Sequence, residues 1–182
     1  MGKKVLVIST SLRKNSNSEA LAASFVAGAQ EIGCEVAQLS LRGKSIDFCK
    51  GCMACQKTLH CIIKDDANAI VEQMGKADVL VFATPIYYYG MSGQMKTLLD
   101  RANPLFPSDY AFRDVYLLAT AADEDENAVA GAKKGMEGWI SCFLKSRLKG
   151  VLFCGGVTDT GDIDGNKALE KARQMGRALN EQ

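Results

Sequence analysis

The chain has 182 residues, of which 47% are hydrophobic and 24% charged, and its formal net charge at pH 7 is +1. This length and composition suit one globular domain, so we expect a single domain over residues 1–182. The near-neutral charge argues against nucleic acid and anionic membranes as partners. The longest strongly apolar run, residues 79–83, is too short to span a membrane. Since the polar stretch 9–18 follows the first apolar run, we expect no secretory signal and a cytoplasmic location.

Apolar strands and amphipathic helices alternate along the chain. The expected strands cover residues 4–10, 35–40, 79–83, 114–120 and 149–154. The expected helices start at Ser18, at Asp65 or Asp66, at Ser92, at about residue 125 and at Asp164. The first helix is expected to continue to about residue 32, the second through Met74 and the third through Ala102. The fourth is expected to continue to about residue 145 and the fifth through Leu179. Gly33 is expected to end the first helix.

Five strands separated by helices predict a parallel sheet with helices on both faces, because parallel strands need long crossover connections. In such sheets, ligands bind beyond the carboxyl ends of the strands. The site is therefore expected in the loops 9–18, 84–91, 120–126 and 154–162.

The loop after the first strand is rich in hydrogen-bonding groups. Residues 9–18 include five hydroxyl side chains, the amide of Asn17 and the guanidinium of Arg13. One helix cap needs far fewer such groups, whereas a helix N-terminus with hydroxyls and an arginine suits a phosphate. The patterns Gly-x-x-x-x-Gly-Lys-Ser/Thr and Gly-x-Gly-x-x-Gly are absent, which argues against a nucleoside triphosphatase and a dinucleotide-binding Rossmann site.

Two stretches carry a resemblance to a known family. Residues 11–18, Ser-Leu-Arg-Lys-Asn-Ser-Asn-Ser, resemble the FMN phosphate loop of the NAD(P)H-dependent FMN reductase group of flavodoxin-like proteins, whose pattern is Ser-x-Arg-x-x-(Ser/Gly)-Asn-(Ser/Thr). Residues 85–88, Pro-Ile-Tyr-Tyr, and the later Lys-x-x-x-Asp-Arg at 96–101 match the same group. The resemblance implies a flavodoxin-like three-layer α/β/α sandwich with a five-stranded parallel sheet.

The same resemblance implies which residues bind FMN. The first loop would hold the phosphate, the second would wrap the isoalloxazine ring, and the third would border the flavin. Three adjacent tyrosines cannot all enter one core, so at least one is expected at the surface, either available for stacking or covering the core edge. The implied FMN-binding residues are Ser11, Arg13, Ser16, Asn17, Ser18, Pro85, Ile86, Tyr87, Tyr88, Tyr89, Gly90, Thr120 and Ala121.

The activity implied by the resemblance is that of an FMN-dependent oxidoreductase. Electrons from NAD(P)H would pass through bound FMN to a quinone, a nitro compound, a flavin or a similar small-molecule acceptor. No side chain is assigned as a catalytic acid or base. The family closes its one-sided flavin site with a neighbouring subunit, so a homodimer or homotetramer is implied.

Four of the seven cysteines, Cys49, Cys52, Cys55 and Cys61, form the pattern Cys-x2-Cys-x2-Cys-x5-Cys. This spacing suits the ligands of a [4Fe-4S] cluster and resembles the iron–sulfur flavoproteins, a branch of the same group. Similar flavin reductases carry such a loop without a cluster, and four thiolates also suit zinc. A cluster, free thiols and zinc therefore all stay open. With a cluster, the alternative function is an electron carrier between protein partners, one of them ferredoxin-like.

The remaining cysteines, Cys34, Cys142 and Cys154, lie in apolar patterns and are expected to be small core residues. His60, the only histidine, is expected to face solvent.

Overall fold

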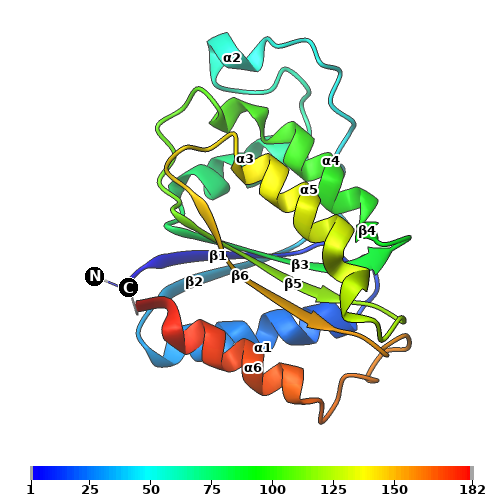
Figure 1. Ribbon diagram of the computed structural model, residues 1–182. Coiled ribbons are helices and arrows are strands. Elements are labelled where there is room, and N and C mark those ends of the chain that lie inside the picture. Colours follow the sequence, from blue (N-terminus) through cyan, green and yellow to red (C-terminus); the bar gives the residue numbers. More distant parts are fainter. Residues whose placement is uncertain (1, 181–182) are drawn as a thin grey trace.

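A parallel sheet forms the middle layer of the computed structural model, which describes residues 2–180 (Figure 1). Its strand order is β2-β1-β3-β5-β6, and neighbours in this order are parallel. The strands are β1 (Lys4–Ser9), β2 (Glu35–Ser40), β3 (Val79–Tyr87), β5 (Asp114–Thr120) and β6 (Arg147–Cys154). The predicted five-stranded parallel sheet is confirmed, and its order reverses between β1 and β3, where such sheets bind ligands.

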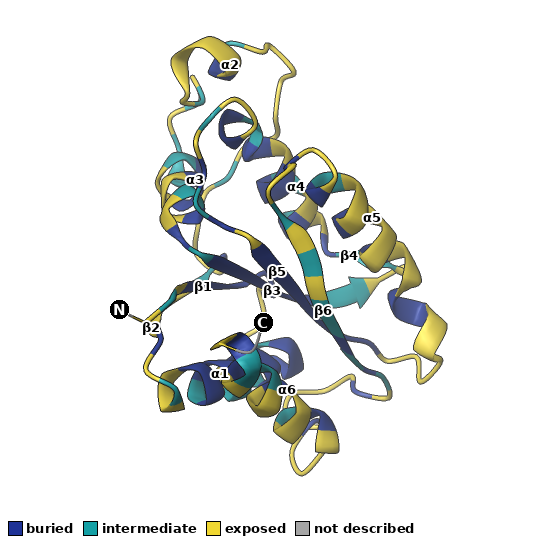
Figure 2. Ribbon diagram, turned by 60° about the vertical axis from the view of Figure 1, so that its left-hand side comes forward, coloured by how far each residue is buried: buried dark blue, intermediate teal, exposed yellow. Residues whose placement is uncertain are grey.

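Helices cover both faces of the sheet, which confirms the predicted three layers (Figures 1 and 2). One face carries α1 (Asn17–Glu31) and α6 (Lys167–Arg177), and the other carries α3 (Asp66–Lys76), α4 (Gly93–Arg101) and α5 (Ala130–Ile140). Shorter elements lie in the connections: α2 (Cys55–Thr58), η1 (Asn103–Leu105), η2 (Glu126–Val129) and η3 (Ala178–Asn180).

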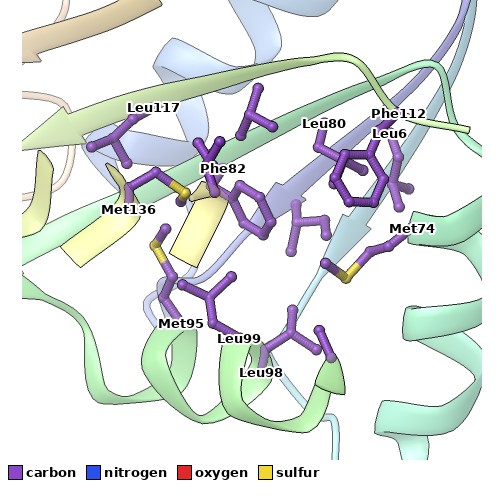
Figure 3. Close-up of a cluster of buried hydrophobic side chains, with 14 of the residues drawn as sticks. Leu6, Met74, Leu80, Phe82, Met95, Leu98, Leu99, Phe112, Leu117 and Met136 are labelled. Carbon is purple, nitrogen blue, oxygen red and sulfur yellow. The ribbon is translucent and has the colours of Figure 1, made fainter. Parts of the chain in front are cut away.

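Each face of the sheet has its own apolar core, because successive side chains of a strand point to opposite faces. On one face, Leu80 and Phe82 of β3 pack with Met95, Leu98 and Leu99 of α4 (Figure 3). The alternate residues of β3 pack in the second core, beneath α1 and α6. Burial on both faces explains why the strands read as continuous apolar runs.

Two predicted helix caps are wrong by two residues. Ser16 caps α1 instead of Ser18, and Asn166 caps α6 instead of Asp164. Both caps have extended backbone, so their side chains accept an N–H from the first turn, whereas Ser18 already lies inside the helix. The predicted cap Ser92 and the predicted stop at Gly33, with φ of 78°, are confirmed, and Asp65 caps α3.

The long helix predicted over residues 125–145 is shorter. It starts as the 3₁₀ helix η2, and α5 ends at Ile140. Beyond it the chain turns, with the Phe143 N–H donating to the carbonyl oxygen of Ile140 at 2.8 Å. The turn packs the ring of Phe143 against Tyr110 and Phe112. The spacing between Phe143 and the preceding apolar residues is compatible with both a continued helix and this turn. The apolar pattern alone therefore does not distinguish the two structures.

None of the helices between residues 2 and 180 combines the length and the apolarity that a membrane span requires.

Two glycines allow α1 and α6 to cross closely. A methyl group added to Gly28 would lie 1.9 Å from the carbonyl oxygen of Arg173, and one added to Gly176 would lie 2.2 Å from that of Phe25. Larger residues at these positions must therefore push the helices apart.

We predict that Gly176→Ala destabilises the protein by about 1–3 kcal/mol through overpacking. The control is Gly138→Ala on the exposed face of α5, where the added methyl group meets nothing within 4 Å. This control should instead stabilise by about 0.5–1 kcal/mol, because alanine favours a helix over glycine. Urea unfolding midpoints measure both changes, and equal effects of the two substitutions would contradict the close crossing.

Candidate functional site

A pocket of about 150 Å³ opens at the carboxyl edge of the sheet, between the loops that follow β1, β3, β5 and β6. It brings together every predicted residue of the first and third loops and three of the second. The predicted residues that line it are Ser11, Arg13, Ser16, Asn17, Ser18, Pro85, Ile86, Tyr87, Thr120 and Ala121. The predicted residues Tyr88, Tyr89 and Gly90 do not line it.

Polar side chains at the start of α1 are buried in the wall of this pocket. Ser11, Ser16, Asn17 and Ser18 are each at most 7% exposed. The Ser16 hydroxyl accepts the N–H of Glu19 at 3.3 Å, as an N-cap does. Because the first backbone N–H groups of a helix lack intrahelical partners, this end of the 15-residue helix α1 favours an anion.

The loop after β6 supplies three pocket residues that were not predicted: Val157, Thr158 and Thr160. Arg13 Nη1 donates to the carbonyl oxygen of Thr158 at 2.7 Å, and Asn17 Nδ2 donates to that of Asp159 at 2.9 Å. The loop was expected at this edge from its place after a strand. Its residues carry no phosphate-loop or aromatic pattern, so no single residue stood out.

The carboxylate of Asp162 stabilises the conformation of the loop after β6. Asp162 accepts the backbone N–H groups of Thr158 at 2.8 Å and Asp159 at 2.7 Å. These two hydrogen bonds lower the pKa of Asp162. The carbonyl groups of residues 158 and 159 are thereby positioned toward Arg13 and Asn17.

The second loop is a tight hairpin. β3 runs four residues beyond its predicted end at residue 83, and the two-residue strand β4 (Gly90–Met91) pairs antiparallel with it. The turn residues Tyr88 and Tyr89 have φ of 48° and 61°, as a two-residue hairpin turn with matching twist requires. Tyr88 is fully exposed, which confirms that at least one tyrosine lies at the surface.

The hairpin is held from behind by two neighbours. A methyl group on Gly131 would lie 2.2 Å from the carbonyl oxygen of Tyr89, so the start of α5 packs directly on the turn. The Tyr89 hydroxyl donates to Asp123 Oδ2 at 3.1 Å, which ties the hairpin to the loop after β5. This hydrogen bond, together with the charge of Asp123, raises the pKa of Tyr89.

Buried hydroxyl groups join the bases of the first two loops. Thr10 Oγ1 lies 3.0 Å from Ser92 Oγ, and the Ser92 N–H donates to Thr84 Oγ1 at 3.1 Å. Thr10, Thr84 and Ser92 are all completely buried. The end of β1, the later half of β3 and the start of α4 are thus fixed to one another.

The four clustered cysteines lie in a separate region, the cysteine segment (residues 48–64), which projects from the body of the fold at α2 (Figure 1). Cys49 and Cys52 are exposed, Cys55 is buried and Cys61 is partly buried. Within residues 2–180, no three His, Cys, Asp or Glu side chains are arranged to hold a metal ion. The structure therefore does not bring the four predicted metal ligands together, and their role stays a prediction. His60 is exposed, as expected.

The other three cysteines divide into two classes. Cys34 and Cys154 are buried in the apolar core as predicted, and burial raises the pKa of both thiols. The prediction for Cys142 is wrong, because this residue is exposed. It lies beyond the end of α5 at Ile140, where the chain has left the helical spacing that placed it inward.

Residues 3–146 match the family model described as NADPH-dependent FMN reductase. The chain is 36% identical over 102 residues to an iron-sulfur flavoprotein of Methanocaldococcus jannaschii, a stretch that covers 56% of this chain and about half (53%) of that relative. It is 26% identical over 181 residues to an iron-sulfur flavoprotein of Archaeoglobus fulgidus, covering 98% of this chain and 79% of the relative.

Among solved structures, the NAD(P)H:quinone oxidoreductase from Methanothermobacter marburgensis superimposes with a TM-score of 0.76 at 19% identity. The superposition covers 100% of this chain and 98% of the other. At this level of identity the similarity concerns the fold, and it confirms the predicted flavodoxin-like architecture.

We predict that Asp123→Asn lowers the pKa of Tyr89 towards the ordinary tyrosine value of about 10, because the neutral amide no longer opposes the phenolate. NMR titration of ring-labelled tyrosine measures this, with Tyr89→Phe to assign the signal. Tyr116, whose pKa burial raises to about 12, serves as the internal control and should not move. An unchanged Tyr89 titration in Asp123→Asn would show that the hydrogen bond does not form in solution.

Proposed function

The chain belongs to the NADPH-dependent FMN reductase family, and from this membership we propose that its pocket binds FMN and passes electrons from NAD(P)H to a quinone, nitro compound, flavin or similar small-molecule acceptor. The resemblance found in the sequence is confirmed at the level of the family. As a member, the protein is an oxidoreductase that uses FMN and NAD(P)H. The particular acceptor and the roles of individual residues are part of the proposal.

The observation that carries the proposal is the polar end of the pocket. Buried hydroxyls and an amide surround the start of α1, and an arginine lies beside them. Hydroxyl donors, free helix N–H groups and a guanidinium are the groups that bind a phosphate monoester. We assign Ser11, Ser16, Asn17 and Ser18 to the FMN phosphate, with Arg13 adding a charged donor.

The other end of the pocket suits a planar ring. Pro85, Ile86 and Tyr87 form one apolar wall, and Thr120 and Ala121 contribute from the neighbouring strand. The small side chain of Ala121 leaves room for a ring, and the hydroxyl of Thr120 is a hydrogen-bonding group at its edge. Ile86 and Tyr87 belong to the hairpin that Gly131 and Asp123 hold in place, so these residues are positioned to orient the ring.

FMN, when bound, supplies the redox chemistry, accepting hydride from NAD(P)H and delivering electrons to the acceptor. The residues of this chain bind and orient it. We assign no side chain as a catalytic acid or base.

Further parts of the proposal concern the state of the protein. We propose that it is a single domain that works in the cytoplasm as a homodimer or homotetramer. An open pocket supports the oligomer, because a neighbouring subunit would shield the bound flavin from water.

We predict that Arg13→Ala raises the dissociation constant for FMN by about ten- to a hundredfold, since a hydrogen bond to a charged group contributes about 1.5–3 kcal/mol. Flavin fluorescence titration measures the change. The matched control is Lys14→Ala, which removes a neighbouring exposed charge that does not line the pocket. If both variants lose equal affinity, the effect is general electrostatics and the assignment of Arg13 is wrong.

A second candidate function is an electron carrier that serves protein partners, one of them ferredoxin-like, and holds an iron–sulfur cluster in the cysteine segment. It is favoured by the cysteine spacing and by relatives named iron-sulfur flavoproteins. The present arrangement does not fit a cluster, because within residues 2–180 no three cysteine, histidine or carboxylate side chains are grouped to hold a metal ion. Cluster binding therefore requires the segment to rearrange.

The visible absorption spectrum of protein purified without oxygen, with an iron and acid-labile sulfide assay, separates the two functions. The proposed reductase shows two flavin bands that NADH or NADPH bleaches, without iron. The electron carrier shows a broad additional shoulder with about four iron and four sulfide per chain. A colourless protein that binds no added FMN would contradict both.

A further inference from the structure

The cysteine segment has little apolar burial to hold it in place. Of its residues, only Cys55 is buried, and its large apolar side chains Phe48, Met53, Leu59 and Ile62 are exposed. The ribbon around α2 is accordingly coloured mostly as exposed (Figure 2). Apolar packing is the usual source of positional order in a folded chain. The segment must therefore depend on polar contacts for its position.

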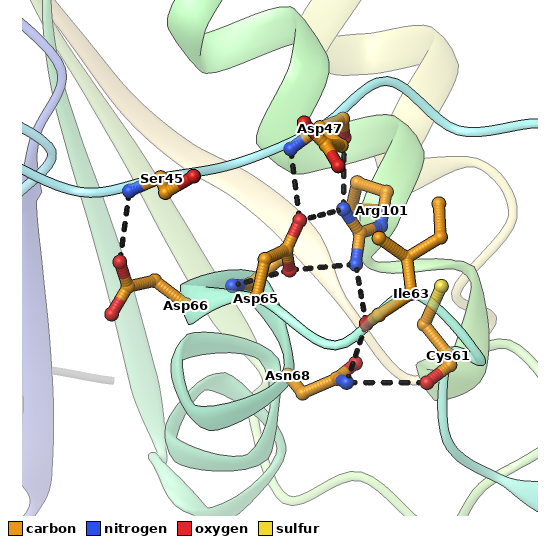
Figure 4. A network of polar contacts seen from close by, with 9 residues as sticks. Ser45, Asp47, Cys61, Ile63, Asp65, Asp66, Asn68 and Arg101 are labelled. Atoms are coloured by element: carbon orange, nitrogen blue, oxygen red, sulfur yellow. Dashed lines mark hydrogen bonds and ion pairs between the residues drawn. The ribbon is translucent and has the colours of Figure 1, made fainter.

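Several of those contacts converge on Arg101, the last residue of α4, and two more come from Asn68 (Figure 4). The Asn68 Nδ2 donates to the carbonyl oxygens of Cys61 at 3.1 Å and Ile63 at 2.9 Å. The Arg101 guanidinium donates to both oxygens of the Asp65 carboxylate, at 2.5 and 2.8 Å. It also donates to the carbonyl oxygens of Asp47 at 2.8 Å and Ile63 at 3.3 Å. Asp47 immediately precedes the cysteine segment, Ile63 lies near its end, and Asp65 immediately follows it. One side chain thus closes the base of the loop.

The Asp65 carboxylate also helps to hold the two ends of the cysteine segment together. Besides Arg101, it accepts the backbone N–H of Asp47 at 2.8 Å and that of Ala67, in the first turn of α3, at 3.0 Å. Burial acts to raise the pKa of Asp65, but the hydrogen bonds from Arg101 and from these N–H groups outweigh it and the pKa is lowered. The carboxylate is therefore ionised at neutral pH, and its hydrogen bond raises the pKa of Arg101.

The ion pair between Arg101 and Asp65 is buried. The Arg101 side chain is 0% exposed and that of Asp65 is 5% exposed. Among the described residues, Arg101 Nε is the buried side-chain nitrogen that has no hydrogen-bond partner. A buried arginine with one donor unused has a high desolvation cost. Lysine, with a single charged nitrogen, does not offer the planar fork that spans a carboxylate and two carbonyl groups.

A second contact from the same region reaches a sulfur atom. Asn103, two residues beyond Arg101, donates through Nδ2 to Cys55 Sγ at 3.1 Å. Cys55 is the one buried residue of the segment, so this contact fixes its middle while Arg101 fixes its ends.

We propose that Arg101 is a positioning residue for the cysteine segment, holding its two ends so that Cys55 stays buried against Asn103 while Cys49 and Cys52 stay exposed. The inference goes beyond the proposed function, because Arg101 lies at the far end of α4 from the pocket. Neither Arg101 nor any other residue of α4, a helix about 13 Å long, lines the pocket.

The experiment measures alkylation by iodoacetamide of each cysteine, followed by mass spectrometry, on the FMN-loaded protein purified without oxygen. In the native protein, Cys49 and Cys52 should react quickly and Cys55 slowly. In Arg101→Gln, Cys55 should react about tenfold faster or more, because breaking a buried ion pair is strongly destabilising.

Internal controls separate local release from general unfolding. Cys34 and Cys154 lie in the apolar core and should stay slow, and FMN affinity should stay within about twofold. Lys96→Gln, which removes an exposed ion pair with Asp100 on the same helix, should leave all rates unchanged. Arg101→Lys should resemble Arg101→Gln, because it keeps the charge but loses the fork.

Three outcomes would overturn the proposal. Cys55 could react at the native rate in Arg101→Gln, which would show that Arg101 does not position the cysteine segment. Cys34 and Cys154 could accelerate together with Cys55, which would make Arg101 a residue of global stability. Arg101→Lys could restore the native rates fully, in which case a buried charge is sufficient and the bridging of two segment ends is not the cause.

Discussion

Hydrogen bonds in parallel register join β3 to β1 on one side and to β5 on the other. Ser9 lies beside Ala83, Ala83 lies beside Leu118, and Pro85 lies beside Thr120. Because all these strands end at one edge, loops that are far apart in the sequence meet there. The buried hydroxyls of Thr10, Thr84 and Ser92 then fix the loop bases. Both the polar and the apolar end of the pocket depend on this register.

The pocket and the cysteine segment differ in how they are held. The pocket stands on a sheet that is buried on both faces, so packing and backbone hydrogen bonds together fix its walls. The cysteine segment has one buried residue and is held mainly by polar contacts, among them the Arg101–Asp65 pair at its base. Packing resists local motion everywhere in a core, whereas the cysteine segment is held by a small set of polar contacts that includes the buried Arg101–Asp65 pair. The segment is therefore the part of the molecule best able to rearrange.

Residue spacing alone predicted the strands and most helices, because a strand buried on both faces leaves a continuous apolar run. It also placed the first-loop residues and Thr120 at one edge. It did not exclude Tyr88 and Tyr89 from the pocket, since their left-handed turn depends on pairing between β3 and β4 and on the close approach of Gly131. It placed the loop 154–162 at this edge but singled out none of the pocket residues Val157, Thr158 and Thr160, of which Thr158 contacts Arg13 through its backbone carbonyl group. The role of Arg101 was hidden because its partners lie 36 to 54 positions away in the chain.

We propose above all that the start of α1 recognises a phosphate on a flavin. The most direct test compares the affinity of the flavin-free protein for FMN and for riboflavin, which carries the same ring without the phosphate. With several donors directed at the phosphate, FMN should bind at least about a hundredfold more tightly. Equal affinities would show that the polar end of the pocket does not bind phosphate and would contradict the account.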